Sequence, residues 1–156
     1  MKSEVTILLV EDSQTDRELI SEALKDTKLK HILRVAVDGE EALLFLQTER
    51  PDLILLDLNL PKKSGFEVLK TMKQDPALRA IPVIVLTNST APSDVESCYA
   101  SCANAYVRKP LGFDGFVDVF RTTARFWFQV ATLPVEIPSR ISQAVSVPPS
   151  FPPDSE

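Results

Sequence analysis

Residues that could bind a cation or a phosphoryl group follow four short apolar runs of this sequence. They are Glu11 and Asp12 after the first run, Asp57 after the second, Thr87 at the end of the third and Lys109 after the fourth. If the runs form parallel strands of one sheet, their carboxyl ends meet at one edge, where ligands of such folds bind. Three carboxylates, a hydroxyl and an ammonium group would then share one crevice. This combination suits a divalent metal ion and the transfer of a phosphoryl group to an aspartate.

The close approach of two carboxylates is the main physical reason to expect the metal ion. Ionised Asp12 and Asp57 on neighbouring strand ends would repel each other, and one would ordinarily stay protonated. Mg²⁺ would remove this repulsion, because it prefers oxygen ligands. We expect Thr87 to donate its hydroxyl to one phosphoryl oxygen and Lys109 to place its charge near another. Each residue alone would more often be a helix cap or a solvated side chain, so the prediction depends on the whole set.

The apolar runs alternate with segments whose apolar residues recur at helical spacing. We expect strands at residues 5–10, 32–37, 53–57, 83–87 and around Tyr106, and helices that begin near Ser13, Gly39, Gly65, Pro92 and Gly112. Strands that are apolar throughout are typical of a parallel sheet buried on both faces. Right-handed connections then place helices on both faces. The predicted fold class is therefore α/β, with a doubly wound parallel sheet of five strands.

Composition argues against several classes of protein. The chain of 156 residues is long enough for one domain with a substantial core. Its net charge of -5 argues against a general nucleic-acid binder, and no apolar stretch approaches the length of a membrane span. The N-terminal residues lack a secretory pattern, so we expect a cytoplasmic protein.

Cysteine and histidine are too few for a disulfide scaffold or a zinc site with several histidines. Cys98 and Cys102 lie four residues apart on one predicted helix, and we expect half-buried, reduced thiols. His31 is the only histidine of the chain. The chemistry of the chain therefore rests on its acidic, hydroxyl and lysine residues.

Four segments together resemble the receiver domain of bacterial two-component response regulators. The segments are V-E-D-S at 10–13, L-L-D-L-N-L-P at 55–61 with the following S-G-F-E, V-L-T at 85–87, and Y-V-R-K-P at 106–110. The resemblance covers roughly residues 4 to 130. It implies a flavodoxin-like sheet with strand order 2-1-3-4-5, and a receiver domain at residues 1–132.

The resemblance also implies roles for the acidic residues. Asp57 would be the phosphoacceptor, phosphorylated by a sensor histidine kinase, and the chain would be a signalling protein and not an enzyme. Asp12 and Asp57 would bind Mg²⁺ directly, Glu11 would bind it through water, and the backbone carbonyl of Asn59 would complete the protein ligands. Glu11 departs from the family pattern, in which aspartate is commoner at this position.

The remaining site residues would respond to the phosphoryl group. Lys109 would contact it, and the Lys109–Pro110 peptide bond would be cis. Thr87 and Tyr106 would form a conformational switch, in which Tyr106 can point outward before phosphorylation and turns inward afterwards. Asn88 is larger than the residue usual beside the switch threonine, which bears on access to the phosphoryl group and on its lifetime.

The last predicted helix has apolar residues on two sides. One stripe is expected to pack on the sheet and consists of Phe113, Val117, Phe120, Ala124 and Trp127. Val119, Phe126 and Val130 lie on roughly the opposite side, at about 100° per residue. Such a helix is buried on two sides, either by core over-packing, by a folded-back tail or by a partner. We favour a homodimer interface that contains these three residues and is formed by the fourth helix, the fifth strand and the fifth helix.

The C-terminal part of the chain differs in composition from the rest. Residues 126–134 resemble the C-terminal extension of small response regulators paired with phytochrome-type histidine kinases. Half of the 12 prolines lie from Pro134 onward. We therefore expect residues 133–156 to be an extended, non-helical arm, and we expect no DNA-binding output domain after residue 134.

Three other functions are compatible with parts of this pattern. An aspartate-nucleophile phosphatase needs a second acid two residues after the nucleophile, and Asn59 cannot transfer protons in that way. A flavin-binding module of flavodoxin type would bind phosphate after the first strand, where Glu11, Asp12 and Asp16 would repel it. A non-phosphorylated dimeric scaffold would not need the intact set of site residues, although Asn88 leaves this alternative open.

Overall fold

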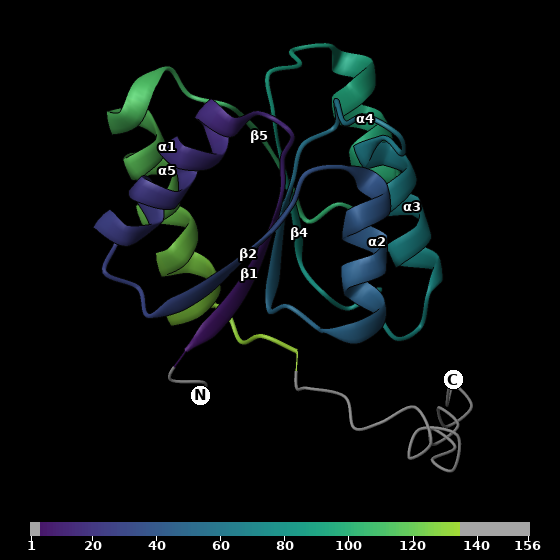
Figure 1. The fold of residues 1–156 in the computed structure, drawn as a ribbon, viewed down its shortest axis with the longest axis horizontal. Coiled ribbons are helices and arrows are strands. Elements are labelled where there is room, and N and C mark those ends of the chain that lie inside the picture. The colour runs from purple at the N-terminus through teal and green to yellow at the C-terminus, as the bar shows by residue number, and fades with distance from the viewer. Residues whose placement is uncertain (1–3, 135–156) are drawn as a thin grey trace, which may run out of the picture.

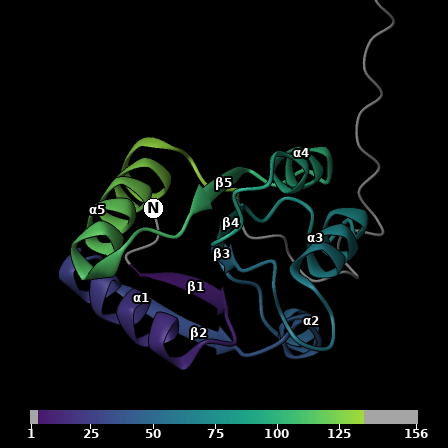
Figure 2. The same cartoon turned by 90° about the horizontal axis from the view of Figure 1, so that it is seen from above.

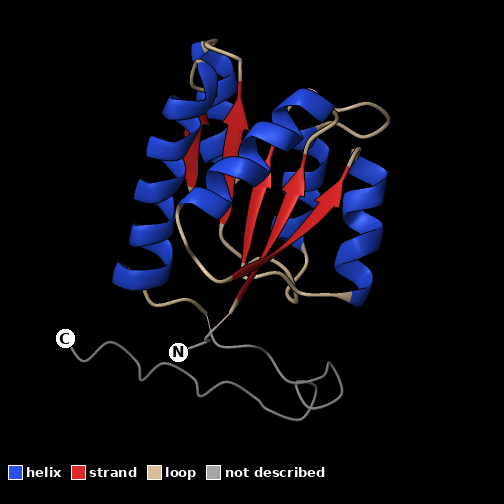
Figure 3. Cartoon of the chain, turned by 60° about the vertical axis from the view of Figure 1, so that its left-hand side comes forward, coloured by secondary structure: helices blue, strands red, loops and turns tan. Residues whose placement is uncertain are grey.

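The computed structural model describes residues 4–134 and contains five strands that alternate with five α-helices in this range. The strands are β1 (Val5–Val10), β2 (His31–Ala36), β3 (Leu53–Leu56), β4 (Val83–Thr87) and β5 (Ala105–Arg108). The helices are α1 (Gln14–Asp26), α2 (Gly39–Thr48), α3 (Gly65–Gln74), α4 (Pro92–Ala100) and α5 (Gly112–Arg125). A short π-helix, η1 (Phe126–Val130), extends α5. Figure 3 shows the strands at the centre with the helices around them.

The strands form one parallel sheet in the order β2-β1-β3-β4-β5, which confirms the predicted strand order. Helices α1 and α5 cover one face of the sheet, and α2, α3 and α4 cover the other (Figures 1 and 2). The sheet is therefore doubly wound, as the alternation of runs and helical patterns predicted.

Each face of the sheet has its own apolar core. The core under α1 and α5 contains Leu53 and Leu55 of β3, and the core under α2, α3 and α4 contains Ile54 and Leu56 of the same strand. Successive strand side chains point to opposite faces, so a strand with a core on both sides needs an apolar residue at every position. This explains why the runs in the sequence are continuous and do not alternate.

Three helices have side-chain caps at the edge where the strands end. The side chains of Ser13, Asp38 and Ser64 accept hydrogen bonds from backbone N–H groups three residues on, in α1, α2 and α3 respectively. Of the two caps considered for the first helix, Ser13 and Thr15, the structure uses Ser13. Such caps satisfy N–H groups that the first helical turn leaves unpaired. They hold the chain in place where it leaves the sheet, beside the predicted site.

Some predicted boundaries and exposures are wrong. β2 ends one residue earlier than predicted, and Val37 beyond it is 38% exposed. Phe113 was assigned to the sheet-facing stripe of the last helix, but it is 41% exposed and lines an open pocket together with Thr15 and Leu19 of α1. Phe116, one turn further along α5, is buried in its place. Val117, Phe120 and Ala124 are buried as predicted.

Residues 4–134 contain no cis peptide bond, so the Lys109–Pro110 bond is trans. The cis expectation came from the resemblance and is therefore corrected. For a bond that precedes proline, the two isomers differ by only about 0.5–1 kcal/mol in favour of trans. Within the same residues, none of the helices is long and apolar enough to span a membrane.

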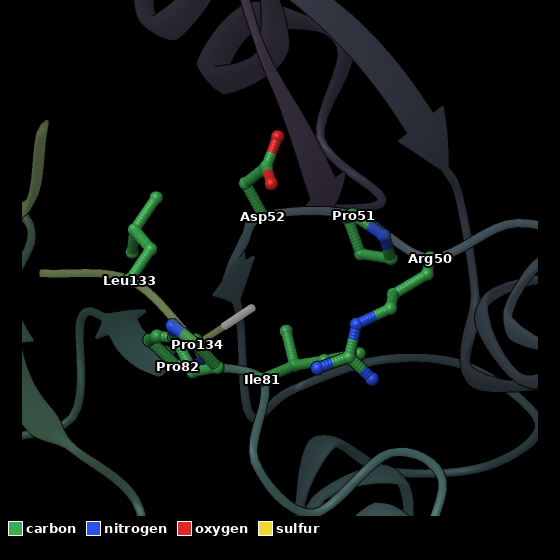
Figure 4. Close-up of a pocket in the computed structure, with 7 residues that line it drawn as sticks. All are labelled: Arg50, Pro51, Asp52, Ile81, Pro82, Leu133 and Pro134. Atoms are coloured by element: carbon green, nitrogen blue, oxygen red, sulfur yellow. The ribbon is translucent and has the colours of Figure 1, made fainter. Parts of the chain in front are cut away.

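The chain continues past α5 through η1 and then passes the amino ends of β3 and β4, opposite the carboxyl ends of the strands. Trp127 and Phe128 pack against the core under α1 and α5, which confirms the inward position predicted for Trp127. Leu133 and Pro134 border a small pocket together with residues 50–52, Ile81 and Pro82 (Figure 4). This pocket lies where β3 and β4 begin, far from their carboxyl ends. The extended arm predicted at residues 133–156 lies, from residue 135 onward, outside the described residues.

Candidate functional site

The carboxyl ends of β1 and β3 bring three acidic side chains together. The two strands pair with Val10 opposite Leu56, so Glu11 and Asp57 leave the sheet at the same level. The backbone N–H of Asp57 donates to the carbonyl oxygen of Val10 at 3.0 Å and continues this pairing. Carboxylate oxygens of Glu11, Asp12 and Asp57 all lie within 4.8 Å of one another. Glu11 and Asp57 are buried, whereas Asp12 is exposed.

Lys109 supplies the positive charge of this cluster. Its Nζ donates to Oδ2 of Asp57 at 3.1 Å and to Oδ2 of Asp16 at 2.7 Å, and it also forms an ion pair with Glu11. The lysine side chain is only 5% exposed. Its backbone N–H donates to the carbonyl oxygen of Thr87 at 2.8 Å, which ties the residue after β5 to the end of β4. The ammonium group is thereby held over the ends of β1 and β3.

Burial and the neighbouring charges determine the protonation of Glu11 and Lys109. Burial raises the pKa of Glu11 from its ordinary value of 4.5 to about 7; the hydrogen bond from Lys109 lowers it, and the charge of Asp57 raises it. Burial alone would lower the pKa of Lys109, but hydrogen bonds to Asp16 and Glu11 outweigh this effect and raise its pKa. Lys109 therefore stays charged at neutral pH, while Glu11 is partly protonated in the metal-free protein.

The cluster has the donor atoms and the charge that a divalent cation requires. The ammonium group of Lys109 forms ion pairs with three carboxylates, those of Glu11, Asp16 and Asp57, and the Asp12 carboxylate lies beside those of Glu11 and Asp57. Carboxylate oxygens are the ligands that hard divalent cations prefer. Burial is the main cause that raises the pKa of Glu11, and an added dication would offset the further contribution from the charge of Asp57. The residues present therefore fit a divalent metal ion.

Asn59 lies in the loop between β3 and α3, next to the acidic cluster. Its backbone N–H donates to Oδ1 of Asp57 at 3.4 Å. The backbone of Gly65 packs closely against the start of the same loop. A Cβ atom at that position would lie 2.2 Å from the carbonyl oxygen of Asp57. Only glycine allows this approach of two backbone segments. The loop therefore brings the Asn59 backbone close to the side chain of Asp57.

Thr87 and Tyr106 are linked through the backbone of Ser89. Thr87 is fully buried at the end of β4, and its hydroxyl oxygen accepts the N–H of Ser89 at 3.5 Å. The Tyr106 hydroxyl donates to the carbonyl oxygen of Ser89 at 2.9 Å, and the ring packs against the core under α3 and α4. The Tyr106 ring thus has the inward position in this structure, and its role as a switch stays a prediction. The hydrogen bond to Ser89 and the contact with the core hold the ring inward.

These groups lie at the carboxyl edge of a 2-1-3-4-5 sheet, and the stretch of chain that holds them matches a known family. The family model of the response regulator receiver domain matches residues 7–121 of this chain. The chain belongs to the response regulator receiver family.

Relatives of this receiver include regulators of phytochrome systems. It is 44% identical over 135 residues to the response regulator Rcp1 of Synechocystis sp., a match that covers 82% of this chain and 92% of Rcp1. The phosphorylated cyanobacterial phytochrome response regulator RcpA has a similar structure, with a TM-score of 0.80 and 40% identity over 84% of this chain and 99% of RcpA. The structure of the Mn²⁺-bound form of Rcp1 has a TM-score of 0.78 and 43% identity, and the match covers 83% of this chain and 99% of the chain in that structure.

The structure of the receiver adds residues to the site that the sequence reasoning did not assign to it. Asp16 contacts Lys109 from the first turn of α1, and Arg17 Nη1 donates to the carbonyl oxygens of Glu11 and Asp12 at 3.1 and 2.9 Å. The only signal in the sequence was their position, within one helical turn of the acidic pair. Ser89 Oγ forms a short hydrogen bond with Oδ2 of Asp94, which ties the loop after β4 to the first turn of α4.

The residues predicted for the dimer interface of the receiver differ in exposure. Phe126 and Val130 are 50% and 66% exposed, whereas Val119 is half-buried and packs against the core under α1 and α5. On α4, Tyr99 is 51% exposed, and its hydroxyl accepts the backbone N–H of Tyr106 at 3.2 Å. Exposed apolar side chains are thus present on the last helix and on α4.

Proposed function

We propose that this receiver accepts a phosphoryl group on Asp57 from a sensor histidine kinase, with Mg²⁺ as cofactor, and signals through the loop after β4. The observation that carries the proposal is the buried carboxylate of Asp57 between Lys109 and the acidic pair, with Lys109 Nζ 3.1 Å from Oδ2. The membership in the receiver family supports it. A phosphorylated relative, RcpA, and a Mn²⁺-bound relative, Rcp1, are consistent with both parts of this chemistry.

Phosphoryl transfer forms a bond between a carboxylate oxygen of Asp57 and phosphorus. The bond between phosphorus and the donor histidine nitrogen breaks, and its electron pair returns to the imidazole. Glu11, Asp12, Asp57 and the carbonyl of Asn59 would hold Mg²⁺, which neutralises charge on the phosphoryl oxygens when bound. Lys109 stays protonated and turns its N–H donors toward one of those oxygens.

The signal would pass from Thr87 to α4 through Ser89. When the Thr87 hydroxyl donates to a phosphoryl oxygen, it moves toward Asp57, and the N–H of Ser89 loses its acceptor at 3.5 Å. Ser89 is also bonded to Tyr106 and Asp94, so a shift of this residue changes both the switch tyrosine and the first turn of α4. If the phosphoryl group interacts more favourably with one of the two states by a few kcal/mol, the equilibrium shifts to that state.

The partners we propose are a phytochrome-type histidine kinase and a second copy of the chain. The kinase type is supported by the similarity to RcpA, a cyanobacterial phytochrome response regulator, and to the bacteriophytochrome response regulator RtBRR. The homodimer would use α4, β5 and α5, with Val119, Phe126 and Val130 at the interface, and the exposure of Phe126 and Val130 supports it. An apolar surface of this kind is typical of an interface with another protein. Measurement of the molecular mass in solution, with and without beryllofluoride and Mg²⁺, tests whether binding at the Asp57 site changes the dimerisation of the chain.

The experiment that tests the proposal is labelling with a small phosphodonor. Wild-type chain is incubated with acetyl phosphate and Mg²⁺, and the intact mass is measured beside Asp57→Asn and the matched control Asp52→Asn. We expect the mass of one phosphoryl group on the wild type and on the control, and none on Asp57→Asn. Undiminished labelling of Asp57→Asn would refute the assignment. Release of inorganic phosphate at many turnovers per chain would instead support the phosphatase alternative.

A further inference from the structure

Asp16 is a charged residue of the site that the proposed function leaves without a role. It lies in the first turn of α1, where its backbone N–H donates to the Ser13 hydroxyl at 3.3 Å. Its carboxylate accepts from Lys109 Nζ at 2.7 Å, compared with 3.1 Å for the contact between Lys109 and Asp57. It is not one of the three carboxylates whose oxygens lie together as a metal site. Asp16 therefore binds Lys109 although it does not belong to the three acidic residues of the metal site.

An ammonium group has three N–H donors, and three carboxylates engage the one of Lys109. A phosphoryl oxygen on Asp57 needs at least one of these donors. The side chain of Glu11 is 1% exposed and that of Asp57 is 8% exposed, whereas that of Asp16 is 23% exposed. A carboxylate that loses its cation is destabilised unless water replaces it. Asp16 is thus the acid that Lys109 can leave at the lowest cost.

We propose that Asp16 is a positioning residue that competes with the phosphoryl group for Lys109 and so sets how readily the phosphorylated state forms. This inference rests on the proposed function. In the unphosphorylated protein, Asp16 holds the ammonium group on the α1 side of the site. On phosphorylation, Lys109 moves from Asp16 to a phosphoryl oxygen, and Asp16 becomes hydrated. The charge of Asp16 also repels an anionic phosphodonor as it approaches.

The test compares variants that differ in charge at one position. Asp16→Asn keeps the shape and an oxygen acceptor but removes the charge, and Asp16→Glu keeps the charge. Glu18→Gln is the matched control, because it removes an exposed carboxylate of the same helix that hydrogen-bonds to Gln14 and not to Lys109. Each full-length protein is labelled with acetyl phosphate and Mg²⁺, and its affinity for beryllofluoride is measured by titration with Mg²⁺ present.

We expect Asp16→Asn to label about fivefold faster than the wild type and to bind beryllofluoride about fivefold more tightly. The gain should shrink as salt is added, because it is electrostatic. It should also be smaller with phosphoramidate, which is monoanionic at neutral pH, than with dianionic acetyl phosphate. Asp16→Glu and Glu18→Gln should stay close to the wild type. If Asp16 only stabilised the fold, Asp16→Asn would have a changed melting temperature, but its labelling rate would not depend on salt and donor charge in this way.

Equal or slower labelling of Asp16→Asn, with beryllofluoride affinity unchanged or weaker, would overturn the inference. Asp16→Ser, which also lacks the charge and suits the first turn of a helix, is the second variant and must show the same gain. These outcomes differ from failure of the proposed function, in which wild-type chain is not labelled at all or Asp57→Asn is labelled equally.

Discussion

The ammonium group of Lys109 lies 3.1 Å from Oδ2 of Asp57, although β4 separates the strands that these two residues follow. The lysine comes after β5, at the edge of the sheet, and Asp57 comes after β3, at its centre. Its backbone bond to Thr87 holds the lysine at the end of β4, from where the side chain crosses to β1 and β3. The site thus depends on the strand order as well as on the residues.

Removal of the lysine should destabilise the metal-free protein. Lys109→Met would leave the buried carboxylates of Glu11 and Asp57 without a cation, which lowers the free energy of unfolding by roughly 3 kcal/mol. Mg²⁺ should restore a part of this loss, because it supplies the missing positive charge. Urea denaturation with EDTA and with Mg²⁺ measures both values. Lys25→Met, at an exposed ion pair of α1, is the control and should change stability by less than about 1 kcal/mol.

Stability without metal should fall as pH rises from 4.5 to about 7. The folded state holds the Glu11 proton with a pKa of about 7, against an ordinary value of 4.5. Because the folded pKa is the higher one, the stability contributed by Glu11 is complete below 4.5 and is lost as pH rises to about 7. The cost of ionised Glu11 is on the order of 3 kcal/mol. Glu11→Gln should remove this pH dependence, which urea denaturation in EDTA at about pH 5 and pH 8 measures. An equal slope in the two proteins contradicts the prediction.

Gly65 should be intolerant of a side chain. A Cβ atom there would meet the carbonyl oxygen of Asp57 at 2.2 Å and Cα of Leu58 at 2.7 Å, and backbone cannot move aside cheaply. We expect Gly65→Ala to lower the free energy of unfolding by roughly 2 kcal/mol or more and to slow labelling of Asp57. Lys70→Ala, on the exposed side of the same helix, should leave both unchanged. Wild-type stability and labelling in Gly65→Ala would show that the loop does not need this contact.

The two cysteines should differ in reactivity. Cys98 is fully buried and burial raises its pKa to about 11, whereas Cys102 is exposed. A thiol alkylating reagent at about pH 8 should therefore modify Cys102 in the folded protein and reach Cys98 only after denaturation. Peptide mass spectrometry assigns the modified residue, and Cys102→Ser is the control that should stay unmodified when folded. Fast modification of Cys98 in folded Cys102→Ser would contradict its burial.

The fold could be predicted because its signals are local and redundant. The run at Leu53–Leu56 has an apolar residue at every position, which is required for a strand with a core on both faces. Strands that end in acids, a hydroxyl or a lysine then specify one edge of the sheet, because parallel strands end at the same edge. The candidate site residues Asp12 and Asp57 follow from that rule without knowledge of distances.

Other features depend on information that the sequence does not carry. Asp16 and Lys109 are 93 residues apart, and their ion pair depends on the position of α1 above the end of β1. Phe113 was assigned to the core because helical spacing alone does not tell whether the first turn of a helix is covered by its neighbours. The inward position of Tyr106 depends on a hydrogen bond to the Ser89 backbone. All three features depend on tertiary contacts, which local patterns do not determine.

The most direct test of the central claim is chemical localisation of the phosphoryl group. Full-length chain is phosphorylated with acetyl phosphate and Mg²⁺, and the acyl phosphate is reduced with borohydride, which converts a phosphorylated aspartate into homoserine. Peptide mass spectrometry should find this conversion at Asp57, and the conversion should disappear when EDTA replaces Mg²⁺. Conversion at Asp12 or Asp16, or none in any peptide of a folded and Mg²⁺-loaded sample, would contradict the account.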